Sequence, residues 1–311
     1  MVKKHALFCV FCLLITTVSS QVEIDSMELQ ELDEVVVSDS RFPIKRENSG
    51  KTIIKISSEE LENNQGKSVA EIINTRSGIE INGSRSRQGE VLGVFARGGR
   101  GRQVLILIDG IRVSDPSSFS QEYDLRLLAT SNIESIEIIK GAASTLYGMS
   151  AATAVINIKS KKASDKKISG DFQSSIGTNQ SSSDQNYNIA EFSNSARVSG
   201  SLESLTYSLG FSNVYTNGLS SIITEANEED PFSRYNIDLK LGYSFKNKIN
   251  LTLYANQTNL NSAYDESFGF IDAPYTFLTE QKRLGLSSKW KYKKGDLSLN
   301  GSFTNYKSDN R

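Results

Sequence analysis

Cysteine and histidine are almost absent from this 311-residue sequence. The two cysteines, Cys9 and Cys12, and the one histidine, His5, all lie close to the N-terminus. If the segment that holds them is cleaved, the mature chain has no side chain for a disulfide or a thiolate metal site. Histidine-based catalysis and histidine-rich metal sites are then excluded as well.

The segment that holds these three residues has the pattern of a secretory signal. It contains, in order, a positive start, an apolar stretch and a small-residue cleavage site: Lys3, Lys4, Ala6 to Ile15, Val18 and Ser20. Residues 1–20 are therefore predicted to be a signal peptide, removed before Gln21. The apolar stretch is short for a bilayer-spanning helix, and a retained N-terminal anchor is the alternative.

The sequence also lacks a large net charge of either sign, because 35 basic residues nearly balance 36 acidic residues. No basic face for a nucleic-acid partner is expected from this balance. Hydrophobic residues make up only 38% of the chain, and no apolar run after the signal approaches the ~20 residues of a membrane-spanning helix. An exported chain of this kind is expected to be periplasmic, secreted or a β-barrel.

The chain after the signal falls into an acidic tail and a mixed α/β region. Residues 21–48 are predicted to form a flexible tail with one strand-prone patch, Val35 to Val37. Residues 49–162 combine strand patterns, such as Val104 to Ile108, with a capping-box helix start at Ser68. Asp109-Gly110 directly follows that strand and predicts a hairpin turn.

Residues 163–311 lack helical patterns and alternate between apolar and polar side chains. From Tyr235 to Phe245, for example, every second residue is apolar. Seven strands are predicted, starting near Ile168, Tyr187, Leu205, Tyr235, Ile249, Leu284 and Leu297. A soluble β-sandwich alternates too, but these runs exceed the usual strand length of about 5–6 residues. Long strands with one apolar face favour an outer-membrane β-barrel.

Two sequence blocks resemble the plug domain of TonB-dependent receptors. Phe95-Ala96-Arg97-Gly98-Gly99, followed by Val104 to Arg112, is similar to the family's "RG … LIDGVR" region. Ile133 to Gly141, Ser144 to Gly148 and Ala151 to Lys159 are similar to its "IERIEVLRGPxSxLYGxxAxGGVINI" stretch. The resemblance extends from Asp33 to Arg311. It implies an α+β plug domain over residues 49–162, followed by the antiparallel strands of a transmembrane β-barrel over residues 163–311.

The resemblance also implies a TonB box within residues 31–38. The residues that match it are Asp33, Glu34, Val35, Val36, Val37 and Ser38. A short extended strand on a flexible tail can add to the edge of a partner's sheet through main-chain hydrogen bonds. The implied partner is TonB, together with its inner-membrane energising complex.

Within the plug, charged residues are assigned to contacts with the barrel and other residues to backbone geometry. A plug in a water-filled barrel needs a polar surface, and the predicted contact residues are Arg97, Arg112, Glu137 and Lys140. The predicted structural residues are Gly98, Asp109, Gly110, Gly141, Tyr147, Gly148 and Asn157. The chain departs from the family at Lys140, where Arg is usual, and at Ala142, where Pro is usual. Lysine cannot make arginine's planar bidentate contact, so the family's contact geometry is not expected at this position.

Within the family the chain is most similar to the cobalamin (vitamin B12) receptor group. That group implies a calcium site in an acidic loop, for which the matching residues are Glu228, Asp230 and Asp265. A solvated acidic loop without metal is the alternative, and no other cofactor is expected. An iron–siderophore or haem receptor of the same family is the alternative for the ligand.

The implied activity is active uptake of a small molecule across the outer membrane of a Gram-negative bacterium. The plug and TonB box would face the periplasm and the barrel would contact membrane lipid. No enzyme is expected, because no acid–base pair, nucleophile–base pair or metal cluster is recognisable. A secreted β-rich binding protein or adhesin is the alternative from another class. About seven strands stand against 22 in plugged transporters, so a truncated, non-transporting fragment is expected.

Overall fold

The computed structural model divides the chain into two units, Met1–Glu34 and Val35–Arg311. The structure describes residues 49–64, 66–82, 92–178, 188–218, 222, 229–246, 248–266 and 271–311. It also describes the backbone of two short antiparallel strands, β1 (Val35–Val36) and β2 (Ile44–Lys45). All of these residues belong to the second unit.

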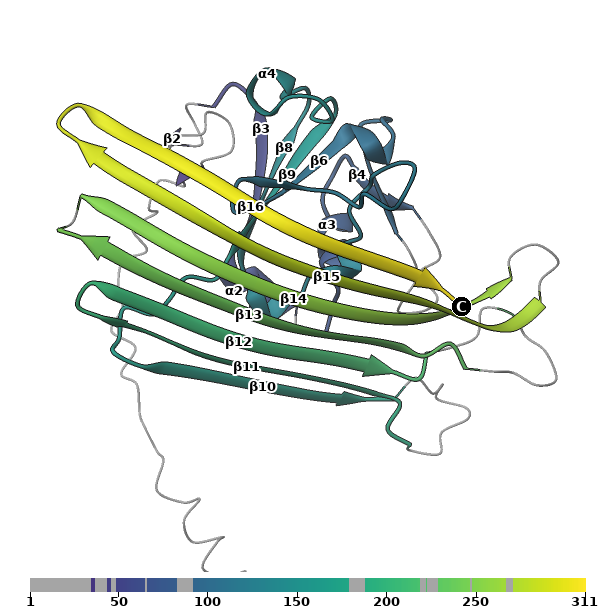
Figure 1. The fold of residues 1–311 in the computed structure, drawn as a ribbon. Coiled ribbons are helices and arrows are strands. Elements are labelled where there is room, and N and C mark those ends of the chain that lie inside the picture. The colour runs from purple at the N-terminus through teal and green to yellow at the C-terminus, as the bar shows by residue number, and fades with distance from the viewer. Residues whose placement is uncertain are drawn as a thin grey trace, which may run out of the picture. The chain divides into compact units, whose positions relative to one another are not determined.

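The first part of this unit is an α/β domain built on a five-stranded sheet (Figure 1). In spatial order its strands are β3 (Thr52–Ile56), β8 (Ile133–Lys140), β9 (Ala154–Ser160), β6 (Val104–Ile108) and β7 (Ile111–Val113). Strands β6 and β9 are parallel and the other neighbours are antiparallel. A separate hairpin pairs β4 (Ile79–Asn82) with β5 (Gly93–Ala96). Asp109-Gly110 forms the predicted turn between β6 and β7, and both residues have positive φ.

Short helices connect these strands. They are α2 (Ser58–Asn63), α3 (Val69–Asn74), α4 (Ser144–Tyr147) and the 3-10 turns η2 (Gly101–Gln103), η3 (Leu125–Leu127) and η4 (Thr130–Asn132). The predicted capping box is confirmed, because the Ser68 side chain accepts from Glu71 N and the Glu71 carboxylate accepts from Ser68 N at 2.6 Å. None of the described helices has the length and apolar character needed to cross a bilayer.

Both faces of the five-stranded sheet are apolar. One face carries isoleucines of β3, β6, β8 and β9, including Ile56, Ile138 and Ile156. It packs against α2, α3 and η3. The other face carries a smaller cluster around Leu105, Ile139 and Val155. A sheet covered on both faces explains why β6 is a continuous apolar run instead of an alternating one.

The second part of the unit is an antiparallel sheet in which strand order follows chain order, here named the long-strand sheet. Its strands are β10 (Ser169–Gly177), β11 (Glu191–Leu202), β12 (Leu205–Thr216), β13 (Phe232–Phe245), β14 (Ile249–Glu266), β15 (Ile271–Tyr292) and β16 (Gly295–Asn310). The elements of the α/β domain lie over one face of this sheet (Figure 1). Within the described residues β10 and β16 are the two edges.

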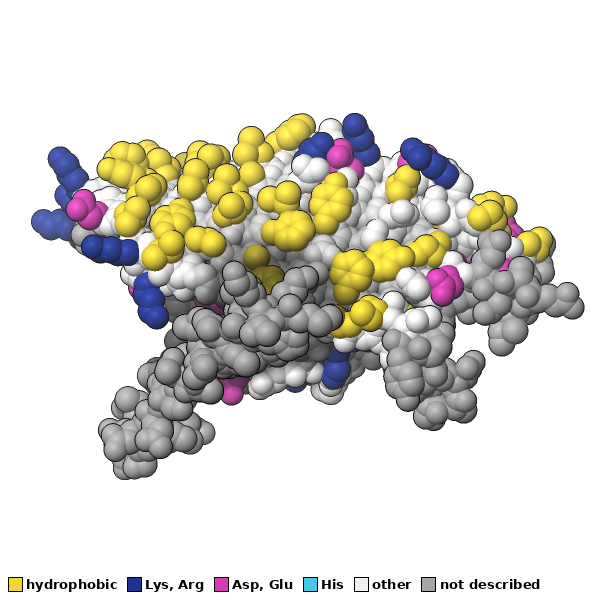
Figure 2. All heavy atoms as spheres, turned by 90° about the horizontal axis from the view of Figure 1, so that it is seen from below, with side chains coloured by type: hydrophobic (Ala, Val, Ile, Leu, Met, Phe, Trp, Pro, Cys, Tyr) yellow, Lys and Arg dark blue, Asp and Glu magenta, His cyan; other side chains and the backbone are white. Residues whose placement is uncertain are grey.

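The predicted alternation along β13 is confirmed. Tyr235, Ile237, Leu239, Leu241, Tyr243 and Phe245 are all exposed. Asn236, on the opposite face, is 3% exposed because it lies against the α/β domain. Figure 2 shows the resulting apolar outer face, with hydrophobic side chains spread across neighbouring strands.

The predicted start of one strand was wrong. β15 begins at Ile271, well before the expected start near Leu284, whereas β12 and β14 begin at the predicted Leu205 and Ile249. Pro274 lies within β15, although proline cannot donate a ladder hydrogen bond. In the structure the pairing shifts register between Tyr264 and Glu266, and this irregularity lets β15 continue past the proline. The expected start at Tyr187 lies outside the described residues.

The capping box yields a prediction for stability. We expect Ser68→Ala to lower the free energy of unfolding by about 1 kcal/mol, because the amide of Glu71 loses its acceptor at the start of α3. Ser58→Ala is the matched control, since Ser58 makes only a surface hydrogen bond to Glu62. Thermal unfolding of both purified variants measures the difference. Equal losses in the two variants would contradict the assignment.

Candidate functional site

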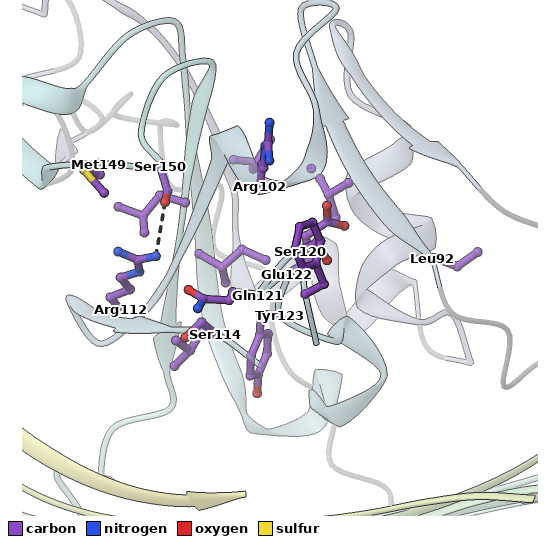
Figure 3. Close-up of a pocket in the computed structure, with 17 residues that line it drawn as sticks. Leu92, Arg102, Arg112, Ser114, Ser120, Gln121, Glu122, Tyr123, Met149 and Ser150 are labelled. Carbon is purple, nitrogen blue, oxygen red and sulfur yellow. Dashed lines mark hydrogen bonds between the residues drawn. The ribbon is translucent and has the colours of Figure 1, made fainter. Parts of the chain in front are cut away.

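A cavity of about 260 Å³ lies in the α/β domain between β5, the β6–β7 hairpin and the loop 114–123 (Figure 3). Its wall mixes apolar and polar side chains. The lining includes Val94, Val104, Ile106, Arg102, Arg112, Ser114, Gln121, Glu122, Tyr123, Met149 and Ser150. Phe119 and Met149 also line it although their side chains are almost fully exposed. Apolar surface with a few polar groups is typical of sites for small organic ligands.

Two arginines provide the positive charge of this cavity. Arg112 Nη2 donates to Ser150 Oγ at 3.2 Å, which joins β7 to the segment after α4 (Figure 3). Arg102 comes from η2, on the other side of the cavity. Glu122 also lines the cavity and supplies a carboxylate, which lies beside Gly101 of η2. The site can therefore offer hydrogen-bond donors to an anionic or carbonyl-bearing ligand as well as one acceptor.

Tyr123 connects this cavity to the long-strand sheet. Its side chain is buried, and its hydroxyl donates to Gln281 Oε1 of β15 at 3.3 Å. Burial raises the pKa of Tyr123 to about 12, and this effect outweighs the opposing attraction of the nearby Arg283 cation. The hydroxyl therefore stays protonated at physiological pH and remains a donor.

The strand connections distinguish the two ends of the long-strand sheet. At one end the chain turns tightly, as at Glu203-Ser204 and Lys293-Lys294. At the other end the connections are longer, from 178 to 190 and from 217 to 231. Outer-membrane strands have short periplasmic turns and longer extracellular loops. Tyr306, which packs against the core of the α/β domain, lies near the long-loop end of β16.

Arg197 of β11 is the centre of a polar network between the long-strand sheet and the α/β domain. Its guanidinium donates to Ser208 Oγ at 2.7 Å within the sheet and to Asn132 Oδ1 of η4 at 2.8 Å. It also forms a 3.2 Å ion pair with Asp238. Asn132 in turn donates to Asn236 Oδ1 at 2.6 Å. Arg197 is only 7% exposed, so its charge depends on these partners.

Arg234 and Lys240 of β13 also make polar contacts with the α/β domain. The guanidinium of Arg234 donates to the carbonyl of Arg126 at 2.9 Å and to that of Leu128. The ammonium group of Lys240 contacts Asp109 Oδ2 at 3.4 Å. It also contacts the Ser160 hydroxyl and the Lys161 carbonyl, where the chain leaves the α/β domain. Sequence reasoning missed these cations, although each stands on the polar face of an alternating strand.

Apolar side chains of the long-strand sheet close the core of the α/β domain. Phe232 and Leu260 are 6% and 2% exposed and belong to the same cluster as the isoleucines of β8 and β9. Val214 and Phe277 pack against it. The interface is therefore an apolar contact surrounded by polar ones.

The four predicted contact residues of the α/β domain have their described partners within that domain. Arg112 donates to Ser150, Lys159 pairs with the buried Glu137, and Lys140 Nζ donates to Ser77 O at 3.1 Å. Arg97 has a φ of 52° and lies beside Gly141. The described contacts to the sheet come from other residues, so the assignment of these four to barrel contacts stays a prediction.

The structure describes the conformation or packing of each residue predicted to shape the backbone, and their structural roles stay a prediction. Gly98, Gly110, Gly141 and Gly148 all have positive φ, where other residues are strained. Asp109 also has a positive φ, and its carboxylate accepts from Ser160 N at 2.9 Å. Tyr147 packs on the Leu105 cluster, and Asn157 is buried in β9.

The remaining predicted sites are only partly described. Val35 and Val36 form β1, which pairs with β2, whereas Asp33, Glu34, Val37 and Ser38 lie outside the described residues. For the calcium site, Glu228 lies outside them. Asp230 and Asp265 are buried, and Asp265 accepts from Ala273 N at 3.3 Å. Among the described residues no cluster of three metal-ligating side chains is present.

Comparison with known proteins places these features in a family. Residues 45–155 match the model of the TonB-dependent receptor plug domain. The vitamin B12 transporter of Vibrio vulnificus is 34% identical over 158 residues, which are 50% of this chain and 25% of that protein. The rhizobactin receptor of Rhizobium meliloti is 30% identical over 167 residues, or 51% of this chain and 21% of that protein. The matched half of the chain therefore covers about a quarter of the length of these relatives.

Solved structures have the same arrangement of an α/β domain and a long-strand sheet. The ferric enterobactin receptor of Pseudomonas aeruginosa is similar with a TM-score of 0.64 at 19% identity, covering 83% of this chain and 41% of that one. The ferric yersiniabactin uptake receptor of Yersinia pestis has a TM-score of 0.62 at 16% identity, covering 84% and 41%. At this identity the likeness shows the fold alone. The sequence matches identify residues 45–155 as a plug domain of the TonB-dependent receptors, in a chain that is similar in sequence to the vitamin B12 transporters.

Proposed function

We propose that this chain is part of an outer-membrane receptor that takes up a scarce nutrient, with cobalamin as the favoured ligand. The observation that carries the proposal is the pairing of a plug-type α/β domain with a sheet that is apolar outside and polar inside. Cobalamin is favoured because several of the relatives at 30–34% identity are vitamin B12 transporters. The cavity lined by Arg102, Arg112 and Tyr123 is the proposed point of ligand contact.

The proposed mechanism couples ligand binding to TonB. A ligand in the cavity favours one state of the α/β domain, provided that it binds this state more tightly than the other. The TonB box then becomes available in the periplasm, and TonB pulls on the tail to open a path. Polar contacts such as those of Arg197 and Lys240 suit this step, because water can replace their partners when the domain moves.

An iron–siderophore ligand is the second candidate. Two arginines line the cavity, and cations with planar donors suit anionic oxygen-rich ligands. The similarity to the rhizobactin receptor also supports a siderophore as the ligand. A haem ligand has no comparable support. A secreted β-rich binding protein, the alternative from another class, does not account for an outer face with so many exposed apolar residues.

Uptake and its dependence on TonB test the proposal. We expect cells that lack their own transporter to accumulate cobalamin when they express the whole receptor of which this chain is part, and not when they express this chain alone. Val36→Pro should abolish accumulation without reducing binding at the cell surface, because proline removes a main-chain donor from the strand offered to TonB. Val22→Pro, outside the proposed TonB box, should leave uptake unchanged. Uptake that survives Val36→Pro would contradict the TonB-box assignment, and a receptor that takes up neither ligand class would contradict the function.

The cavity arginines separate the two ligand classes. We expect Arg102→Gln with Arg112→Gln to weaken binding of an anionic ferric siderophore by about tenfold or more, since charge-assisted hydrogen bonds are lost. Cobalamin binding should change less. Equilibrium binding to isolated outer membranes measures both. The control is Arg100→Gln, which removes a neighbouring arginine that does not line the cavity; an equal effect there would exclude a specific role for the cavity.

The Arg234 contact yields a stability prediction. Arg234→Gln should lower the free energy of unfolding by about 1–3 kcal/mol, because the carbonyls of Arg126 and Leu128 lose a charged donor. The control is Arg311→Gln, an exposed residue paired with its near neighbour Asp309. Heat-induced loss of protease resistance in the α/β domain is the measurement. A variant as resistant as the control would show that this contact does not hold the domain.

A further inference from the structure

Lysines gather at the short-turn end of the long-strand sheet. They precede β10, occupy the β13–β14 and β15–β16 turns, and end β15: Lys166, Lys167, Lys246, Lys248, Lys289, Lys291, Lys293 and Lys294. All eight are exposed. In Figure 2 basic side chains stand at the left end of the apolar face. We name this group the lysine rim.

Few acidic side chains neutralise the lysine rim. Asp165, Glu203 and Asp296 are the described carboxylates at the same end, and only Asp296 forms an ion pair with a rim lysine, Lys289, at 2.5 Å. The long-loop end has the opposite balance. Its described charged residues are mostly acidic, namely Glu191, Glu229, Asp230, Asp265, Glu266, Asp272 and Asp309, against Arg234, Lys307 and Arg311. Among the described residues, basic side chains therefore outnumber acidic ones at the short-turn end and acidic side chains outnumber basic ones at the long-loop end.

Aromatic side chains lie directly beside the lysine rim on the apolar face. Tyr243 and Phe245 form an edge-to-face pair with ring centroids 4.5 Å apart, just before the β13–β14 turn. Trp290 and Tyr292 end β15 and are 46% and 64% exposed. Indole and phenol rings of outer-membrane strands collect at the boundary between hydrocarbon and headgroups. The lysine rim thus begins where the apolar face ends.

From this arrangement we infer that the lysine rim binds the headgroups of anionic phospholipids in the periplasmic leaflet of the outer membrane. This inference rests on the proposed function only in placing the long-strand sheet in a membrane. The aromatic belt fixes the depth of the strands, and lysine stems can lie along the boundary while their ammonium groups reach phosphate oxygens. Each lysine near an anionic surface contributes to the attraction, which is screened by salt.

A lipid surface fits the lysine rim better than a folded protein partner. The rim is spread over strand ends on both sides of the β11–β12 turn, which carries no lysine, and it adjoins the exposed apolar face. A ligand with both an acyl chain and an anionic headgroup matches these two adjoining surfaces. A protein partner would need to cover the turns without contacting the apolar face.

Trp290 provides a built-in probe, because it is the single tryptophan of the chain and lies between Lys289 and Lys291. The receptor extracted from outer membranes is reconstituted into phosphatidylethanolamine vesicles that contain either brominated phosphatidylglycerol or brominated phosphatidylethanolamine. Bromine quenches only nearby indole, so the ratio of the two quenching efficiencies reports anionic lipid beside the rim. The signal of a Trp290→Phe variant is subtracted as background.

We expect brominated phosphatidylglycerol to quench Trp290 at least about threefold more efficiently at low salt, with the preference reduced at high salt. Lys293→Gln with Lys294→Gln should remove most of this preference. Lys282→Gln with Lys307→Gln, which neutralises two lysines away from the short turns, should keep it. Intact heat-modifiable migration of all variants verifies folding.

Equal quenching by the two lipids would overturn the inference while leaving the uptake function intact, as would a preference that survives loss of Lys293 and Lys294. Quenching by neither lipid would overturn it together with the placement of the sheet in a bilayer. Failure of cobalamin and siderophore uptake, measured separately, would overturn the proposed function without affecting the lipid result.

Discussion

The long-strand sheet has an apolar face that is exposed and a polar face that packs against the α/β domain. The contacts between the two depend on this difference. Because side chains alternate along each strand, the apolar residues of β13 from Tyr235 to Phe245 are all exposed, whereas Asn236 and Arg197 lie beneath the α/β domain. A domain placed on that inner face must satisfy buried charges with hydrogen bonds. The contacts of Arg197, Arg234 and Lys240 do so through side-chain oxygens and backbone carbonyls.

The interface between the α/β domain and the long-strand sheet combines apolar and polar contacts. Phe232 and Leu260 close the core of the α/β domain, so separating the two parts exposes apolar surface. Breaking the surrounding hydrogen bonds costs less free energy, because water molecules can replace the lost donors and acceptors. An interface of this kind can hold the domain at rest and still yield to a pulling force, as the proposed uptake mechanism requires.

Much of the fold was predictable from local patterns. The capping box at Ser68, the turn at Asp109-Gly110 and the alternation from Tyr235 to Phe245 all depend on neighbouring residues, and all appear in the structure. The start of β15 was not predictable in the same way. Its first residues are held by pairing with β14 across a register shift, which local propensity at Pro274 argues against.

The sequence alone determined the family, the change from α/β to strand patterns, and the apolar and polar faces of each strand, because these follow from motifs and from a period of two. Only the tertiary structure decided which charges meet. Lys240 reaches Asp109 across 131 positions, and Arg197 reaches Asn132 across 65. No local pattern encodes such pairings, since they depend on how the α/β domain is seated on the sheet.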